Sequence, residues 1–245
     1  MFKDKQDSIL EAEFSGKKVR YGIPNDVAKW RVQTLLSKEP ETIAWIRTFD
    51  AGELLIDIGA NVGMYTILAA AIQNVCVYAF EPESQNYSQL NKNIYYNQLE
   101  KQVKAYPIAL SHEEAIGELH LSEMILGGSH HQFAREGEEN PGVFIQGCYS
   151  IPLDDILTRL KINNPNYIKI DVDGLEHSVV EGAVNTFRLD SMKSVLIEID
   201  TNNVNHQWVI ETMVDIGYTY SKEQVEEALI KEGNFKGYAN YIFFK

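Results

Sequence analysis

The chain has 245 residues, which suits one large α/β domain with an extension but not two full-size domains. Its 22 basic and 35 acidic residues give a formal net charge of -13 and a pI near 4.9. An acidic surface repels phosphate backbones and anionic lipids, so the charge disfavours nucleic acid or a membrane surface as the main partner.

The N-terminal sequence MFKDKQDSILEAEF is charged throughout and lacks the apolar core of a signal peptide. No segment of the sequence has the apolar length needed to cross a bilayer. Cys76 and Cys148 form neither a disulfide framework nor a CxxC motif. We therefore expect a soluble protein in a reducing cytoplasm, while its oligomeric state stays open.

Residues 1–50 are predicted to form an N-terminal helical extension, with helices over 26–37 and 39–49. Pro40 falls in the first turn of the second helix, where a missing N–H costs little. Two interpretations stay open, because these helices can serve as a capping layer on the sheet or as a lid over a ligand. Residues 51–245 are predicted to form the main domain.

From Glu53 onward, apolar runs alternate with helical patterns, and such near-continuous apolar runs are typical of parallel strands covered on both faces. The predicted strands cover 53–57, 75–81, 103–110, 167–171, 194–200, 218–220 and 241–244. The predicted helices cover 63–71, 84–97, 154–160, 176–186 and 205–215, with Ser84 as an N-cap and Gly217 as a C-terminal stop. The order predicts an α/β fold around a parallel sheet.

One interval, residues 111–151, breaks the alternation. It contains GELHLSE, a polar glycine-rich loop and VFIQGCYSI, which predict two added strands around an exposed loop. We interpret it as a β insertion beside the sheet, after the third strand.

The first predicted strand ends in Asp57, and Gly59, Asn61 and Gly63 follow before a helix begins. Such a turn lets the backbone approach a ligand at the carboxyl edge of the sheet, although glycines can also serve only to turn the chain. Glu81 ends the next strand, where a carboxylate can accept both hydroxyls of a ribose. Together these features indicate a nucleoside-containing cofactor.

The glycine spacing separates two kinds of cofactor. A dinucleotide requires G-x-G-x-x-G, whereas this loop has Gly59 and Gly63 with Asn61 between them and no third glycine at the required place. Asp57 would repel a pyrophosphate and suits a cationic group. S-adenosylmethionine carries a sulfonium, an ammonium and a ribose diol. The loop therefore predicts a methyl-donor site and disfavours a dinucleotide-dependent oxidoreductase.

Several motifs in consistent order over roughly 39–200 resemble the FkbM family of S-adenosylmethionine-dependent methyltransferases: DIGANVG, AFEP, IALS, the GG loop, PLDDIL, YIKIDVDGLEHSVVEGA and SVLIEID. The resemblance implies a class I methyltransferase, Rossmann-like fold, with a seven-stranded, mostly parallel sheet and an antiparallel last strand. It also implies O-methylation, typically of a saccharide or another hydroxyl-bearing natural product.

The resemblance further implies roles for single residues. The methionine part of the cofactor would lie against Asp57, Gly59, Asn61 and Gly63, and the ribose against Glu81. Ala109 and Leu110 would lie near the adenine, and Asp171 would face the reactive end of the cofactor.

Methyl transfer is an in-line displacement, so the protein must mainly align the nucleophile with the methyl group. A sugar hydroxyl has a high pKa, and we therefore expect a proton acceptor. The candidates are the acids Asp171, Asp173 and Glu176, the neighbouring His177, and His130 and His131 in the inserted loop. Glu176 could equally be a helix-start residue, His177 a packing residue, and the loop histidines surface residues without a role.

A Mg²⁺ site is a less favoured alternative, with Asp171 or Asp173, Asp200 and Asn202 or Asn203 as oxygen ligands. The aromatic residues of the tail are expected to belong to the core rather than to stack on sugar; they are Tyr238, Tyr241, Phe243 and Phe244.

Several functional alternatives stay open. The acceptor could be an amine or a carboxyl group, or the chain could be a non-catalytic S-adenosylmethionine-binding scaffold, against which Asp57, Glu81 and Asp171 argue. A nucleic-acid methyltransferase is disfavoured by the charge and by IDVDG in place of an NPPY-like tetrapeptide. The acceptor pocket is expected to form from the insertion and the N-terminal helices.

Overall fold

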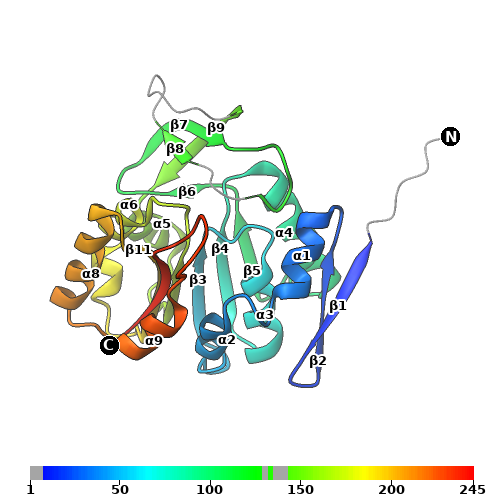
Figure 1. The fold of residues 1–245 in the computed structure, drawn as a ribbon, viewed down its shortest axis with the longest axis horizontal. Coiled ribbons are helices and arrows are strands. Elements are labelled where there is room, and N and C mark those ends of the chain that lie inside the picture. The colour runs from blue at the N-terminus through cyan, green and yellow to red at the C-terminus, as the bar shows by residue number, and fades with distance from the viewer. Residues whose placement is uncertain (1–7, 129–131, 135–142) are drawn as a thin grey trace.

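The computed structural model describes residues 8–128, 132–134 and 143–245. Its centre is a seven-stranded sheet in the order β12-β13-β11-β10-β3-β4-β5 (Figure 1). The strand β13 alone runs in the opposite direction to the other strands of that sheet. This confirms the predicted class I methyltransferase architecture. The strands are β3 (Leu54–Ile58), β4 (Cys76–Phe80), β5 (Val103–Tyr106), β10 (Tyr167–Ile170), β11 (Ser194–Asp200), β12 (Thr219–Tyr220) and β13 (Tyr238–Phe244).

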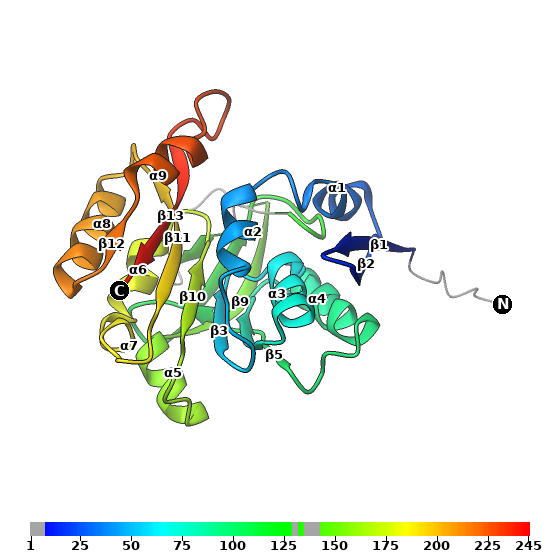
Figure 2. The same cartoon turned by 90° about the horizontal axis from the view of Figure 1, so that it is seen from below.

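Helices cover both faces of this sheet, which gives three layers (Figure 2). The first face carries α2 (Pro40–Ile46), α3 (Met64–Gln73) and α4 (Ser84–Tyr96), and the second carries α5 (Leu153–Leu160), α6 (Glu176–Glu181), α7 (Val184–Phe187) and α8 (Val204–Ile216). Successive strand residues point to opposite faces, so Leu55 packs into the first core and Ile56 into the second. This double burial explains the near-continuous apolar strands.

The N-terminal extension contains a hairpin that was not predicted, formed by β1 (Ile9–Phe14) and β2 (Lys17–Gly22). Val19 and Tyr21 of β2 are fully buried, and the Tyr21 hydroxyl donates to the Met64 carbonyl at 2.8 Å. The predicted helices follow as α1 (Asp26–Thr34) and α2, with Pro40 in the first turn of α2. The extension is therefore part hairpin and part helix.

The insertion contributes to a separate four-stranded sheet in the order β6-β9-β7-β8, which lies at the top of Figure 1. It comprises β6 (Ala109–Leu110), β7 (Ala115–Leu121), β8 (Gln132–Ala134) and β9 (Phe144–Ile151). The two predicted added strands are confirmed as the antiparallel pair β7 and β9. The single predicted strand over 103–110 is wrong, because β5 joins the large sheet and β6 joins the small one, with Pro107 between them.

Three smaller differences from the predictions concern the helices. The N-cap of α4 is Glu83 rather than Ser84, and its side chain accepts from the backbone N–H groups of Gln85 and Asn86. The predicted helix 176–186 divides at Gly182, where a Cβ would lie 2.1 Å from the Ser111 carbonyl oxygen. A further helix, α9 (Lys222–Ala228), was not predicted.

The predicted stop at Gly217 is confirmed, with φ at 108°. Across the described part of the chain, every helix is too short or too polar to span a membrane.

Candidate functional site

A cavity of about 340 Å³ lies at the carboxyl ends of the central strands, where open α/β sheets bind their ligands. Gly59 follows β3, Glu81 follows β4 and Asp171 follows β10, and all three line this cavity. The small sheet closes the cavity from above, since Ala109, Leu110 and Leu119 also line it. The three strand ends that the sequence singled out therefore meet at one cavity.

The loop after β3 needs glycine at two positions. Gly59 has φ of +78° and Gly63 has φ of +83°, a region that side chains with a Cβ rarely adopt. A Cβ at Gly59 would lie 1.8 Å from the Asp171 carbonyl oxygen, and one at Gly63 would lie 2.4 Å from Cδ1 of Leu90. The glycines therefore allow the loop to approach the end of β10 and the side of α4.

Glu81 ties this loop to the end of β4. Its side chain is buried, and its two carboxylate oxygens accept from the backbone N–H groups of Asn61 at 2.8 Å and Glu83 at 2.9 Å. Burial raises the pKa of Glu81 to about 8, although the two backbone hydrogen bonds act in the opposite direction. The neighbouring Glu83 and Asp173 carboxylates add to the rise.

The raised pKa of Glu81, about 8 against an ordinary 4.5, predicts a pH-dependent stability of the cofactor-free protein. Between these values the folded protein keeps a proton that the unfolded chain has released, so the free energy of unfolding falls as pH rises. In Glu81→Gln we expect this contribution to disappear. Denaturant unfolding at pH 5 and pH 8 should then show that the free energy of unfolding of Glu81→Gln, relative to that of the wild type, is higher at pH 8 than at pH 5. An equal difference at both pH values would contradict the prediction.

A charge cluster on one face of the sheet consists of the buried Asp57 and Lys169 and the half-buried Asp171. Lys169 lies opposite Asp57 in the strand register, and its Nζ donates to Oδ2 of Asp171 at 2.6 Å. The Lys169 side chain is only 3% exposed and Asp57 only 1%. Burial raises the pKa of Asp57, against the effect of Lys169. Burial also opposes ionisation of Asp171, but Lys169 outweighs it and holds the pKa of Asp171 below its ordinary value.

A smaller hollow adjoins the cavity beside this cluster. Asp57, Tyr65 and Lys169 line only the hollow, whereas both spaces share Arg31, Lys38, Gly59, Asn61 and Asp171. One carboxylate oxygen of Asp57 is buried and has no hydrogen-bond partner among the described residues. A hollow lined by both cationic side chains and carboxylates suits a zwitterionic amino-acid group.

The N-terminal end of the chain, with helix α1, is hydrogen-bonded to the loop at 126–128, which follows β7. Nε of Arg31 donates to the Gly127 carbonyl at 2.7 Å, and Nδ2 of Asn25 donates to the Leu126 carbonyl at 2.8 Å. From the loop after β3, Nδ2 of Asn61 donates to the Gly128 carbonyl at 2.8 Å. Because α1 also brings Trp30 to the cavity while α2 packs in the core, α1 has the position of a lid and α2 that of a capping layer.

The candidates for proton acceptor occupy different places. Asp171 and Asp173 line the cavity, whereas Glu176 is fully buried away from it. One oxygen of Glu176 accepts from the N–H groups of Val172 and Gly174, at 2.9 and 3.2 Å, and the other lies 3.1 Å from Nε2 of His206. Glu176 therefore holds the loop after β10 in shape from below.

The remaining candidates lie elsewhere. His177 packs near His206, with ring centroids 6.5 Å apart, and it does not line the cavity. His130 and His131 lie outside the described residues.

The residues considered for Mg²⁺ have other partners. Oδ1 of Asp200 accepts from the backbone N–H of Asn202, and Asn203 caps α8 through the N–H of Asn205. Within residues 8–128, 132–134 and 143–245 there is no group of three or more His, Cys, Asp or Glu that could hold a metal ion. The described part of the chain thus gives the metal alternative no support.

Four aromatic and acidic side chains that sequence reasoning did not assign to the site also line the cavity. Glu198 of β11, with Phe235 and Tyr238 of the C-terminal segment, belongs to the end beyond β10, which we call the far end because it is farthest from Glu81 along the sheet, and Trp30 comes from α1. Tyr238 was expected in the core, and its place in the cavity corrects that prediction. Tyr241 and Phe243 are buried as predicted, whereas Phe244 is 44% exposed. The C-terminal segment thus helps to build the far end of the cavity, and α1 contributes separately to the cavity wall.

The sequence was compared with known families, characterised proteins and solved structures. The family described as "Methyltransferase FkbM domain" matches residues 57–229. The chain is 24% identical, over 192 residues, to the hexuronic acid methyltransferase AglP of Haloferax volcanii, an alignment that covers 78% of this chain and 74% of that protein.

Two solved structures share the fold. Methyltransferase FkbM from Methylobacillus flagellatus KT has a TM-score of 0.53 at 14% identity, and the alignment covers 90% of this chain but only 55% of that one. The METTL16 MTase domain also has a TM-score of 0.53, at 13% identity, with 92% of this chain and 82% of that one covered. The chain thus spans little more than half the length of the first structure.

Proposed function

Because the chain belongs to the FkbM methyltransferase family and is a methyltransferase, we propose that it transfers the methyl group of S-adenosylmethionine to a hydroxyl group of a saccharide. The observation that carries the acceptor class is the far end of the cavity, where aromatic side chains stand beside carboxylates. Aromatic faces pack against the apolar faces of sugar rings, and carboxylates accept hydrogen bonds from sugar hydroxyls. The relative named as a hexuronic acid methyltransferase supports a sugar acceptor.

The residues fit the proposed cofactor from end to end. Glu81 offers two carboxylate oxygens for the ribose diol, and Phe80, Ala109, Leu110 and Leu119 give the adenine an apolar wall. The unpartnered oxygen of Asp57 suits the ammonium group, and Arg31 and Lys38 suit the carboxylate at the same end. When bound, the cofactor supplies an electrophilic methyl group.

The chain itself supplies alignment and exclusion of water. Gly59 and Asp171 lie between the nucleoside end and the far end of the cavity, so an acceptor held by Phe235 and Tyr238 meets the cofactor near Asp171. Correct alignment of the two reactants can lower the barrier by about 7–11 kcal/mol. The fastened α1 limits water access from above.

Calorimetric titration tests the cofactor assignment with S-adenosylhomocysteine and with 5′-methylthioadenosine, which lacks the amino-acid end. We expect Glu81→Ala to weaken both ligands by about 10- to 100-fold, since each loses its ribose hydrogen bonds to the Glu81 carboxyl group. We expect Arg31→Ala to weaken S-adenosylhomocysteine by about 10-fold and to leave 5′-methylthioadenosine unchanged. Equal weakening of both ligands by Arg31→Ala would place the amino-acid end elsewhere.

The acceptor class is tested with methyl-labelled S-adenosylmethionine and a panel of methyl glycosides that includes methyl β-glucuronide, which carries both hydroxyl groups and a carboxylate. Mass spectrometry and alkaline hydrolysis then distinguish an ether product from an ester. A methyl ether supports the proposed function. A methyl ester would make the chain a carboxyl methyltransferase, and methylation of an amino sugar nitrogen would make it an amine methyltransferase.

A further inference from the structure

Transfer to a neutral hydroxyl requires a group that takes its proton. Among the described residues, Asp171 and Asp173 are the predicted candidates that line the cavity. Asp171 lines the cavity, but its carboxylate is engaged by Lys169 at 2.6 Å. Glu176 is buried off the cavity and accepts from two backbone N–H groups. Glu81 accepts from two further N–H groups at the nucleoside end. Besides Asp173, the cavity wall holds one further carboxylate, which the sequence did not single out.

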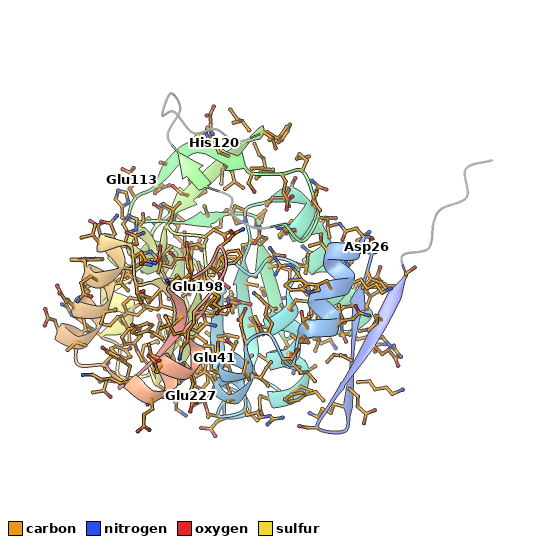
Figure 3. All side chains as sticks on the ribbon, in the orientation of Figure 1. Asp26, Glu41, Glu113, His120, Glu198 and Glu227 are labelled. Atoms are coloured by element: carbon orange, nitrogen blue, oxygen red, sulfur yellow. The ribbon has the colours of Figure 1, made fainter. Side chains whose placement is uncertain are left out.

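Glu198 is an acid that faces the same cavity from β11, the strand next to the one that ends at Asp171. Figure 3 labels it in the interior of the molecule, below the small sheet that carries His120. Among the residues that the structure describes, the Glu198 carboxylate has no hydrogen-bond or ion-pair partner. Its oxygens are thus open to a ligand in the cavity.

The neighbours of Glu198 explain why it stays unpartnered. Its partner across the strand pair is Asn240 of β13, whose side-chain N–H groups turn away toward α2 and donate to Oε1 of Glu41 at 2.8 Å. On its other side, Asp171 already has the nearby cation, Lys169. Glu198 is partly buried and stands in the cavity wall, so its carboxylate is available to a bound molecule.

Resting on the proposed function, we propose that Glu198 is the general base of the methyl transfer and that it accepts the proton of the saccharide hydroxyl. As the acceptor oxygen forms its bond to the methyl carbon, the bond from that carbon to sulfur breaks and its electron pair stays on sulfur. The hydroxyl proton passes to a carboxylate oxygen of Glu198. After the methyl ether leaves, the carboxyl group releases this proton to water.

The electrostatic surroundings of Glu198 suit a base. Burial raises its pKa well above the ordinary value, and the negative charges of Asp171, Glu176, Asp173 and Glu39 act in the same direction. Tyr238 also lines this end of the cavity. A base is most effective when its pKa lies near the working pH, which an ordinary glutamate does not reach. The positive charge of the bound methyl donor favours the ionised, proton-accepting form.

The test compares Glu198→Gln with the wild type, and with Asp173→Asn as the matched variant of a second carboxyl side chain on the same cavity. We expect Glu198→Gln to lower kcat for ether formation by about 10²- to 10⁴-fold. We expect its affinity for S-adenosylhomocysteine to equal that of the wild type. At saturating cofactor, the fall of kcat toward low pH should disappear in Glu198→Gln and persist in Asp173→Asn.

Three results would overturn the inference. In the first, Glu198→Gln keeps the wild-type kcat and pH profile. In the second, only Asp173→Asn shows the loss, which would make Asp173 the base. In the third, the product is a methyl ester, because an ionised carboxyl acceptor carries no proton to remove. The third result also rejects the proposed acceptor, whereas the first two leave it standing.

A measurement without any acceptor completes the test. In protein labelled at the glutamate carboxyl carbons, the resonance that is absent from Glu198→Gln identifies this side chain. We expect it to titrate well above the usual glutamate pKa of about 4.3 in the cofactor-free protein. Titration in the ordinary range would show that Glu198 lacks the basicity that the role requires, whatever the acceptor is.

Discussion

Replacing Lys169 with methionine is expected to lower the free energy of unfolding by about 3–5 kcal/mol, because it leaves two carboxylates without their buried cation. Nζ of Lys169 lies 2.6 Å from Asp171 and opposite Asp57 in the register, and its side chain is 3% exposed. Methionine keeps most of the volume, so the loss reports on charge rather than on a cavity. Chemical denaturation measures it directly.

A double-mutant cycle separates the charge pair from the rest of the site. Asp171→Asn in the Lys169→Met background removes one of the stranded carboxylates, so we expect the double variant to be more stable than Lys169→Met alone. Full additivity of the two single changes would show that the 2.6 Å pair contributes no coupling. The prediction fails if Lys169→Met unfolds within about 1 kcal/mol of the wild type, the usual range for an ordinary substitution.

Lys169 also shows which parts of the site the sequence could predict. Asp57, Glu81 and Asp171 could be found because each stands at the end of an apolar run, and the parallel order of the strands brings those ends to one edge. Lys169 stands inside such a run, in YIKID, and strand periodicity places it on the same face as Asp171. A cation in a strand buried on both faces indicates a buried ion pair, although no sequence motif marks it.

Glu198 was harder to assign. The strand SVLIEID offers two acids, Glu198 and Asp200, on the same face. How far the cavity reaches along the strand decides between them, and that depends on the C-terminal segment with Phe235 and Tyr238 rather than on β11. Asp200 is used in the turn before α8, whereas Glu198 stays in the cavity wall.

The ends of the chain carry no motif, so their contribution depends on long-range contacts. Trp30 comes from α1, and Phe235 and Tyr238 come from the C-terminal segment, more than 200 residues away in sequence. The hairpin at 9–22 did have a local signal, since Val19 and Tyr21 alternate with charged residues after a Ser15–Gly16 turn. High charge obscured that period-two pattern.

The loop after β3, which carries the proposed cofactor site, is expected to tolerate no Cβ at Gly59. The Gly59→Ala variant should lose about 4 kcal/mol of stability or more, since the new Cβ would lie 1.8 Å from the Asp171 carbonyl oxygen and the two backbones would have to separate. That separation moves Asp171 away from Asn61 and Glu81. We therefore also expect the remaining folded protein to lose measurable S-adenosylhomocysteine binding.

Gly52→Ala is the matched control for this prediction. Gly52 has φ of +85°, close to the +78° of Gly59, but a Cβ there would meet nothing within 4 Å. Its substitution should therefore cost only the backbone strain of about 1–2 kcal/mol and leave binding intact. If the two variants unfold at the same denaturant concentration and bind alike, steric contact with Asp171 is not what fixes glycine at position 59. A larger loss in Gly59→Ala assigns the difference to the approach of β3 and β10 across the cofactor site.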